Sequence, residues 1–229
     1  MAEFEALFET YDRLFFFDTE TTGLDFSRDQ IIEFAAVVVE KRDGKAQIVT
    51  EYDELVTLSP GSFVPPQIEK LTGISTQDIR ERGIPKSRVC ADIARMVAGK
   101  TLLLAYNAHF DLSFLFYLLL RDGDPAILKG LDKVDLYTVF KDRRSYPHKL
   151  CNAIDAYGLT GKFVNSHRAV DDVIATVAVA KEMDLEKSDL ERYVNLFGYN
   201  PQYGLGSKPI GSVTYKPQPY DAPKPLYET

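Results

Sequence analysis

Runs of apolar residues along the chain indicate five strands. Residues 31–41 are apolar almost without interruption, which is typical of a strand buried on both faces. Asp43 and Gly44 form a hairpin signal after this run, so the next strand should return antiparallel to it. The predicted strands cover residues 14–18, 31–41, 46–58 and 101–106, and a short segment from Val134.

Other segments carry apolar residues at helical spacing, bounded by capping residues, prolines and glycines. The predicted helices cover residues 1–12, 65–71, a short segment from Ser75, 84–97, 110–121, a segment capped by Asp135, 149–157, 169–183 and 188–197. Three antiparallel strands followed by strands alternating with helices predict an α/β fold. Its mixed five-stranded sheet should be flanked by helices.

Two carboxylates, Asp18 and Glu20, stand at the end of the first predicted strand. Residues i and i+2 of a strand point to the same face, so these side chains should lie side by side. Like charges that close are costly unless a cation lies between them. Carboxylate oxygens are the preferred ligands of Mg²⁺ and Mn²⁺, although a solvated acidic turn also fits this stretch alone.

Two later segments place further acids at helix starts. Asp111 begins the helix after the fourth strand, where a helix N-terminus stabilises a carboxylate. Asp172 begins the 169–183 helix, and His167 lies in the loop before it. Asp171 points about 100° away from Asp172 on a helix, so we expect it to be solvated or paired with an arginine. Each segment alone also fits an ordinary solvated helix start.

Composition narrows the class of protein. The chain has 229 residues, of which 45% are hydrophobic, enough for a packed core. Its 27 basic and 34 acidic residues give a net charge of −7, which argues against coating nucleic acid by bulk charge but not against a metal-dependent nuclease. Cys90 and Cys151 lie far apart, and no apolar run reaches membrane-spanning length. We expect a soluble, cytoplasmic protein without contact to a membrane.

The composition changes at Gly198. Six of the 12 prolines and five of the 13 tyrosines fall in the last 32 residues. We expect a compact domain over residues 1–197 and a C-terminal tail over 198–229. The tail is either extended and partly polyproline-like, or it lies on its own domain or on a partner.

Taken together, the acidic segments resemble the three motifs of the DEDDh exonucleases, the superfamily of the proofreading epsilon subunit of bacterial DNA polymerase III. The matching segments are residues 17–23, 107–111 and 167–172. Residues 71–74 resemble the element that lines the family's nucleotide pocket, whereas Tyr106 stands where family members often have histidine. The resemblance covers about residues 14–184 and implies a ribonuclease-H-like fold, with residues 1–197 as the exonuclease domain.

Phosphodiester hydrolysis explains these residue types. Two divalent ions about 3.5–4 Å apart can clamp the attacking and leaving oxygens, and about four carboxylates nearly neutralise them. We expect Asp18 to bridge two Mg²⁺ or Mn²⁺ ions, Glu20 and Asp172 to hold the ion that activates water, and Asp111 to act through waters on the other. His167 suits removal of a proton from the attacking water.

The resemblance also implies residues that hold the 3′-terminal nucleotide. These are Thr21, Thr22, Gly23, Leu24, Thr72, Asn107 and Phe110. Glycine permits a close backbone approach, Leu24 offers an apolar wedge, and Phe110 either stacks on a base or belongs to the core.

The expected function is 3′–5′ exonuclease activity that releases 5′-mononucleotides from single-stranded or frayed 3′ ends of DNA, in proofreading or repair. An RNA-trimming exoribonuclease of the same superfamily has the same motifs. A third hypothesis is an interaction subunit that docks on a DNA polymerase through its tail. A basic cluster either steers a phosphate backbone or is a solvated helix end. It consists of Lys141, Arg143, Arg144 and Lys149. The sequence leaves the oligomeric state open.

Overall fold

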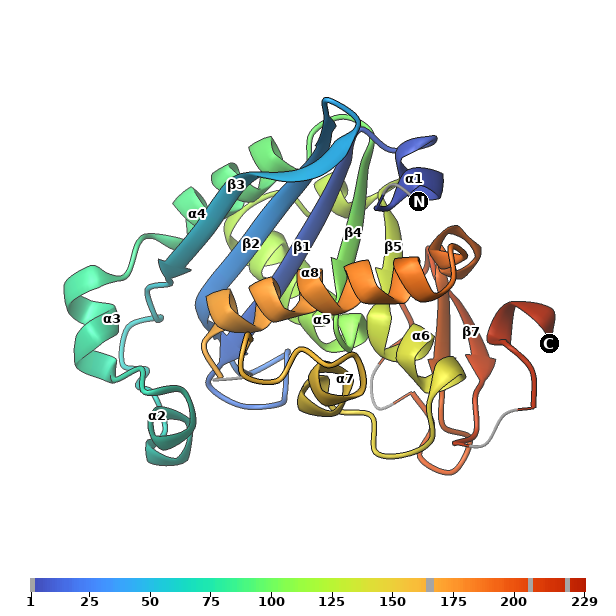
Figure 1. The fold of residues 1–229 in the computed structure, drawn as a ribbon. Coiled ribbons are helices and arrows are strands. Elements are labelled where there is room, and N and C mark those ends of the chain that lie inside the picture. The colour runs from blue at the N-terminus through green and yellow to red at the C-terminus, as the bar shows by residue number, and fades with distance from the viewer. Residues whose placement is uncertain (1–2, 164–166, 206–207, 221–222) are drawn as a thin grey trace.

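The computed structural model describes residues 3–163, 167–205, 208–220 and 223–229. A five-stranded sheet forms its centre, in the order β3-β2-β1-β4-β5 (Figure 1). The strands are β1 (Arg13–Thr21), β2 (Ile31–Arg42), β3 (Lys45–Leu55), β4 (Thr101–Ala105) and β5 (Asp132–Asp135). β2 pairs antiparallel with β1 and β3, whereas β4 pairs parallel with β1 and β5 parallel with β4. The predicted mixed sheet is therefore confirmed.

Helices cover both faces of the sheet. They are α1 (Glu5–Phe8), α2 (Pro66–Thr72), α3 (Thr76–Arg82), α4 (Lys86–Met96), α5 (Ala108–Asp122), α6 (Leu136–Arg143), α7 (Leu150–Ala156) and α8 (Ala169–Glu186), with 3₁₀ turns η1 (Pro125–Leu128), η2 (Leu190–Tyr193) and η3 (Leu226–Glu228). Helix α8 crosses one face of the sheet, and α4 and α5 pack on the other (Figure 1). In the part of the chain that the structure describes, no helix is long and apolar enough to cross a membrane.

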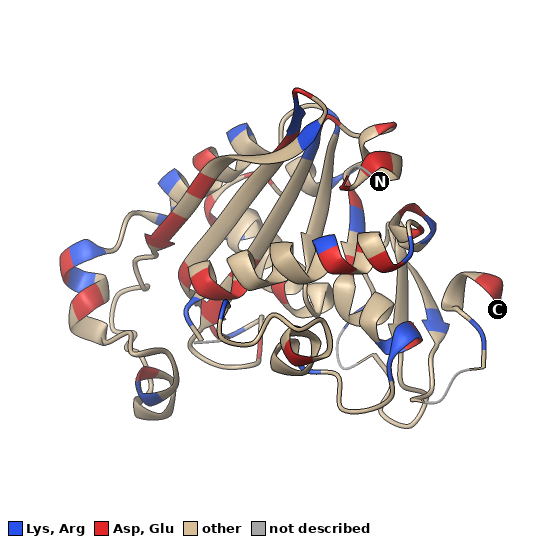
Figure 2. Ribbon diagram, viewed as in Figure 1, with Lys and Arg blue, Asp and Glu red and all other residues tan. Residues whose placement is uncertain are grey.

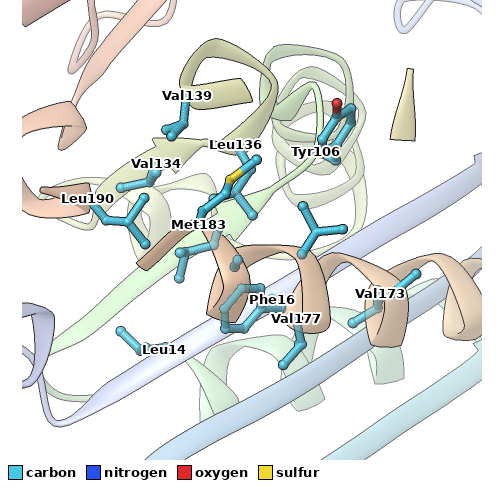
Figure 3. Packing of buried hydrophobic residues seen from close by; sticks show 14 of the residues in the cluster. Leu14, Phe16, Tyr106, Val134, Leu136, Val139, Val173, Val177, Met183 and Leu190 are labelled. Carbon is cyan, nitrogen blue, oxygen red and sulfur yellow. The ribbon is translucent and has the colours of Figure 1, made fainter. Parts of the chain in front are cut away.

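Strand β1 has a core on each side because its side chains alternate. Phe16 belongs to the cluster under α8, together with Val173 and Val177 (Figure 3). Phe15 and Phe17 belong to the cluster against α4 and α5. All three phenylalanines are buried, so the central strand is held firmly from both faces. Side chains at the end of β1 therefore also point alternately to the α8 face and to the α5 face of the sheet.

Local signals fix the helix ends close to the predicted positions. Ser75 forms a capping box with Asp78, and Gly73 ends α2 in the left-handed region at φ 72°. Asp135 accepts hydrogen bonds from the backbone of the first turn of α6, as predicted. The N-terminal helix is shorter than the predicted 1–12: α1 spans four residues, and residues 1–2 lie outside the described part.

The predicted helix over residues 188–197 is wrong. The chain forms the short turn η2 and then strand β6 (Leu196–Tyr199), which pairs parallel with β7 (Thr214–Pro217). Asn195 interrupts the helical path with a φ of 55°. Its backbone N–H donates to Lys133 O at 2.7 Å, and its Oδ1 accepts from Lys133 N at 3.0 Å. These tertiary hydrogen bonds outweigh the helical spacing of the apolar residues.

The described part of the C-terminal segment lies on its own chain. Gln218 is fully buried and donates from Nε2 to Thr138 O at 3.0 Å, while its own carbonyl accepts from Lys141 Nζ at 2.5 Å. Leu226 is also buried, and its backbone N–H donates to Asp142 Oδ2 at 2.6 Å. Among the alternatives for the tail, the structure shows packing against the compact part. Residues 206–207 and 221–222 lie outside the described part.

Replacing Leu226 by alanine tests this packing. The change should lower the free energy of unfolding by about 2–3 kcal/mol, because it removes a buried leucine side chain. Urea unfolding measures this loss. Tyr203→Ala is the matched control in the same segment, since Tyr203 is 67% exposed and its loss should stay within about 0.5 kcal/mol. Equal and small effects of both changes would show that the segment is detached in solution.

Candidate active site

The alternation of β1 decides where its two acids point. Asp18 and Glu20 are in step with Phe16 and therefore face α8, as the strand spacing predicts. Thr19, between them, faces the α5 side. Glu20 is followed by an irregularity in the pairing with β2, at which β1 ends. The end of the central strand therefore presents polar side chains to a helix on each face.

The start of α8 brings a second group of side chains to Glu20. Asp172 lies in the first turn of α8 and is buried, whereas Asp171 beside it is exposed. His167 precedes the helix with a φ of 57° and is exposed. Ligand atoms of Glu20, His167 and Asp172 all lie within 4.8 Å of one another. Two carboxylates and an imidazole at this distance form a group that could hold a metal ion.

Asp111 reaches the end of β1 from the other face. It is buried in the first turn of α5, and its Oδ1 accepts hydrogen bonds from Thr19 N at 3.0 Å and Thr19 Oγ1 at 2.7 Å. Asp135 at the end of β5 accepts a hydrogen bond from Ala108 N at 3.0 Å and so fixes the first residue of α5. Three neighbouring parallel strands thus set the position of Asp111.

The acids repel one another strongly. Burial raises the pKa of Asp18 well above its usual value, and the charges of Asp111, Asp172, Glu20 and Glu33 raise it further. Burial, followed by the charge of Asp172, raises the pKa of Glu20 to about 8. Burial also raises the pKa of Asp111, against the hydrogen bonds from Thr19 that lower it. Figure 2 shows acidic residues at the start of α8 and beside it at the end of β1. A bound divalent cation would relieve this repulsion.

Glu33 belongs to the site although no sequence motif pointed to it. It lies opposite Glu20 in the pairing of β1 and β2 and is fully buried. Its Oε1 accepts from Nε and Nη2 of Arg168 at 2.9 and 2.5 Å, and its Oε2 accepts from Ala169 N at 2.7 Å. Glu33 therefore ties the start of α8, three residues before Asp172, to the central strands.

The sequence contains one indication of a structural role for Glu33, namely its position inside the apolar run of residues 31–41. A carboxylate inside a strand that is buried on both faces must have a partner, because an unpaired buried charge is very costly. Arg168, next to His167, is the cation that the fold brings to it. The partner could not be chosen from the sequence, since 135 positions separate the two residues.

The turn after β1 is built for close approach. Thr22 N donates to Gln30 O at 2.9 Å, and Thr22 Oγ1 accepts from Gln30 N at 3.0 Å. Thr21 Oγ1 donates to Gly23 O at 2.6 Å. A side chain at position 23 would meet the Asp29 carboxylate, which accepts hydrogen bonds from Thr22 Oγ1 at 3.1 Å and Asp25 N at 2.9 Å. The turn is therefore rigid.

Other residues expected to hold the nucleotide vary in exposure. Leu24 is 84% exposed, and Asn107 is an exposed helix N-cap with a φ of 66°. Phe110 is half-buried, with its ring 4.9 Å from that of Phe114. Thr72 is buried, and its hydroxyl donates to Ile68 O at 3.0 Å. Leu24 and Asn107 thus present more surface to a ligand than Thr72 does.

The predicted basic cluster is largely structural. Lys141 is buried and donates to the Gln218 carbonyl, and the Arg143 side chain is only 8% exposed, with Asp189 at 2.5 Å. Arg144 forms an ion pair with Glu186 at 2.7 Å. The prediction that Lys141 and Arg143 steer a phosphate backbone is therefore wrong, because both side chains are bound to partners within the protein.

The geometry agrees with what known proteins show. A family model described as exonuclease, of the RNase T type, matches residues 15–180. The chain belongs to this exonuclease family. It is 34% identical over 161 residues to DNA polymerase III subunit epsilon of Treponema pallidum (strain Nichols), which covers 68% of this chain and 69% of that protein. It is also 36% identical over 107 residues to the 3′-5′ exonuclease DinG of Bacillus subtilis (strain 168), which covers 46% of this chain and 11% of DinG.

The fold of this exonuclease is also found in a solved structure. Escherichia coli Exonuclease I, in complex with a dA16 oligonucleotide, superposes with a TM-score of 0.69 at 24% identity, over 80% of this chain and 42% of that one. The exonuclease thus spans less than half of that chain, and the likeness concerns the fold. The predicted superfamily, the ribonuclease-H-like fold and the predicted enzyme class, a 3′–5′ exonuclease, are confirmed.

The raised pKa values predict how stability depends on pH. The unfolded chain gives up the protons of these acids near pH 4, whereas the folded chain keeps that of Glu20 up to about pH 8. The metal-free exonuclease should therefore lose stability as pH rises from 5 to 8. Calorimetry in EDTA measures the melting temperature, and excess Mn²⁺ should restore more stability at pH 8 than at pH 5, because metal binding releases protons.

Glu20→Gln is the control for this prediction. It removes one of the titrating groups and should reduce the loss of stability between pH 5 and 8 without disturbing β1, the remaining loss coming from Asp18 and Asp111. A wild-type melting temperature that rises over this range in EDTA would contradict the assignment of raised pKa values to the site.

Breaking the pair between Glu33 and Arg168 should destabilise the exonuclease. Arg168→Ala leaves buried Glu33 with the Ala169 amide, and we expect a loss of about 3 kcal/mol, the low end for a buried pair, because Arg168 is 40% exposed. Arg168→Lys should lose less, since it keeps the charge. Urea unfolding compares both with Arg28→Ala, whose side chain is 85% exposed and whose loss should be within about 0.5 kcal/mol. Equal stability of the three variants would refute the role of the pair.

Proposed function

We propose that the chain is a divalent-metal-dependent exonuclease that removes 5′-mononucleotides from the 3′ end of single-stranded or frayed DNA. The observation that carries the proposal is the convergence of Glu20, His167 and Asp172 within 4.8 Å beside Asp18. Hydrolysis of a phosphodiester develops negative charge, and divalent cations held by a cluster of acids can stabilise that charge. The family supports the reaction class, and the geometry supports the metal.

The donor set fits two hard divalent cations. Asp18, Glu20, Asp111 and Asp172 would hold two Mg²⁺ or Mn²⁺ ions, because each offers carboxylate oxygens and each lies in the field of the others. When bound, such ions polarise the scissile phosphate and favour deprotonation of the attacking water. Two observations support this fit: the raised pKa of Glu20, and the hydrogen bonds that leave Oδ2 of Asp111 unused by Thr19.

His167 is the residue that we assign to proton transfer. It lies beside Glu20 and Asp172, and it is exposed, so a water at the site can reach its ring. A positioned general base contributes about 10²–10⁴-fold to a rate. Glu33 and Arg168 act on this step indirectly, because they fix the start of α8 next to His167.

The strand end would lie on the turn after β1. Leu24 is exposed and apolar, and the rigid Thr21–Gly23 turn lets the backbone approach the terminal nucleotide. Asn107 and Phe110 approach from the start of α5. Named relatives support DNA as the polymer, since one is a DNA polymerase III subunit and Exonuclease I is seen with a DNA oligonucleotide.

A polymerase is the partner that these relatives suggest. Besides the epsilon subunit, they include DNA polymerase III of the PolC type, and of that protein the chain covers only about 11%. Buried residues of the C-terminal segment, such as Gln218 and Leu226, are committed to their own chain. A polymerase would therefore contact the outer surface of this segment or another face.

Asp18→Asn should abolish nuclease activity, by at least about 10³-fold, and at the same time stabilise the metal-free protein. The activity falls because a metal ligand is lost, and stability rises because one of several repelling charges is removed. Digestion of a 5′-labelled DNA oligonucleotide in Mg²⁺ or Mn²⁺ measures the first effect, and thermal unfolding in EDTA measures the second. Asp43→Asn is the matched control at the exposed turn between β2 and β3 and should leave both nearly unchanged.

The same assay tests polarity, cofactor and polymer. We expect one-nucleotide steps from the 3′ end, no digestion in EDTA, and faster digestion of DNA than of an RNA oligonucleotide of the same sequence. A folded Asp18→Asn protein with full activity would refute the proposed role of Asp18 as a metal ligand. Much faster digestion of RNA would overturn the choice of DNA and favour an exoribonuclease.

A further inference from the structure

A groove of about 590 Å³ runs along α5. Phe26, in the loop after β1, lies at one wall, and residues 208–212 of the C-terminal segment form another. Phe116 of α5 and Lys129, just after η1, also line the groove. The groove is thus made by parts of the chain that are distant in sequence, and the segment after Gly198 is needed for it.

The groove adjoins the turn after β1, because Phe26 lines it and lies two residues after Leu24. Ser113 and Phe116 line it from the outer face of α5, about 140–200° around the helix from Asp111, which faces β1, and Phe116 lies about 5 Å beyond Ser113 along the helix axis. His109, in the first turn of α5, donates from Nε2 to Lys208 O at 3.0 Å, and its ring lies 5.3 Å from that of Tyr215. These contacts hold the C-terminal segment against the end of α5 that carries Asp111.

The floor of the groove is fixed by a buried lysine. Lys133 of β5 donates from Nζ to Ser212 Oγ at 3.0 Å and also to Leu131 O. This lysine is almost fully buried, and it anchors the loop of the C-terminal segment to the sheet. The wall that carries Lys208 is therefore built into the fold.

The chemistry of the lining selects a polyanion with flat apolar groups. Lys129 and Lys208 are exposed, Phe116 is 42% exposed, and none of the described residues that line the groove is acidic. This is unexpected for a chain with a net charge of −7. Single-stranded nucleic acid offers both phosphates for lysines and bases that stack on aromatic rings. A hydrophobic peptide would leave the two exposed lysines without a counterpart.

We propose that this groove binds the nucleotides upstream of the 3′-terminal one, with Lys129 and Lys208 on phosphates and Phe116 against a base. The proposal rests on the proposed function, since it names how the substrate of the same site is held. It gives the C-terminal segment a role in substrate binding. It also explains how an acidic protein retains a strand whose end lies among carboxylates.

The test compares a short and a long substrate. Steady-state kinetics on oligothymidylates of 2 and 12 residues is measured for the wild type, Lys129→Ala/Lys208→Ala and Phe116→Ala. A dinucleotide has a single nucleotide upstream of the 3′-terminal one, whereas the 12-mer has eleven, so only the 12-mer can extend along the groove. We expect KM for the 12-mer to rise about tenfold in each variant, with kcat nearly unchanged and the dinucleotide unaffected. The dependence of log KM on log salt should become shallower by about 1.4 for the double variant, about 0.7 for each lost phosphate contact.

Two control variants separate an effect of the groove from a general effect of lost charge or lost apolar surface. Lys45→Ala/Lys100→Ala removes the same charge from two exposed lysines at the opposite end of the sheet, and Leu120→Ala truncates an exposed side chain one turn further along α5. The proposal fails if the controls change KM for the 12-mer as much as the groove variants do. It also fails if the groove variants leave the 12-mer unchanged, as they would if the groove binds a peptide. Absence of wild-type digestion of both substrates would instead refute the proposed function.

Discussion

Mutual repulsion among carboxylates at the end of β1 is the constraint on which the site depends. Asp18, Glu20, Asp111, Asp172 and Glu33 raise the pKa of one another or of their neighbours, and burial adds to the effect. Only a firmly held strand can keep such charges together. The central position of β1, with buried phenylalanines packed into a core on each face, supplies that firmness.

The acids differ in how their charge is compensated. Glu33 has a permanent cation in Arg168 and a backbone N–H at the start of α8, so it serves the structure. Asp111 accepts hydrogen bonds from Thr19, and the ligand atoms of Glu20, Asp172 and His167 lie close enough together that they could hold a metal ion. One acid is therefore neutralised to place the helix, and under the proposed function the others hold divalent cations.

The sequence predicts those features that depend on neighbouring residues. The shared face of Asp18 and Glu20 follows from strand alternation, and the position of Asp172 follows from helical spacing. The predicted strands and most of the helices appear for the same reason. Features set by distant contacts could not be foreseen. Asn195 leaves the helical path because of its bonds to Lys133, and Glu33 finds Arg168 across most of the chain.

The C-terminal segment shows how such long-range contacts extend the site. Its composition predicts a tail, yet Gln218 is buried and Lys208 is held by His109, two residues before Asp111. Residues 208–212 of this segment form one wall of the groove along α5, so the groove exists only when the segment is folded against its own chain. The acids lower the stability of the metal-free protein, and this packing offsets part of the loss. If the groove binds substrate as proposed, stability and substrate binding are coupled through the same contacts, and a bound metal would add to both.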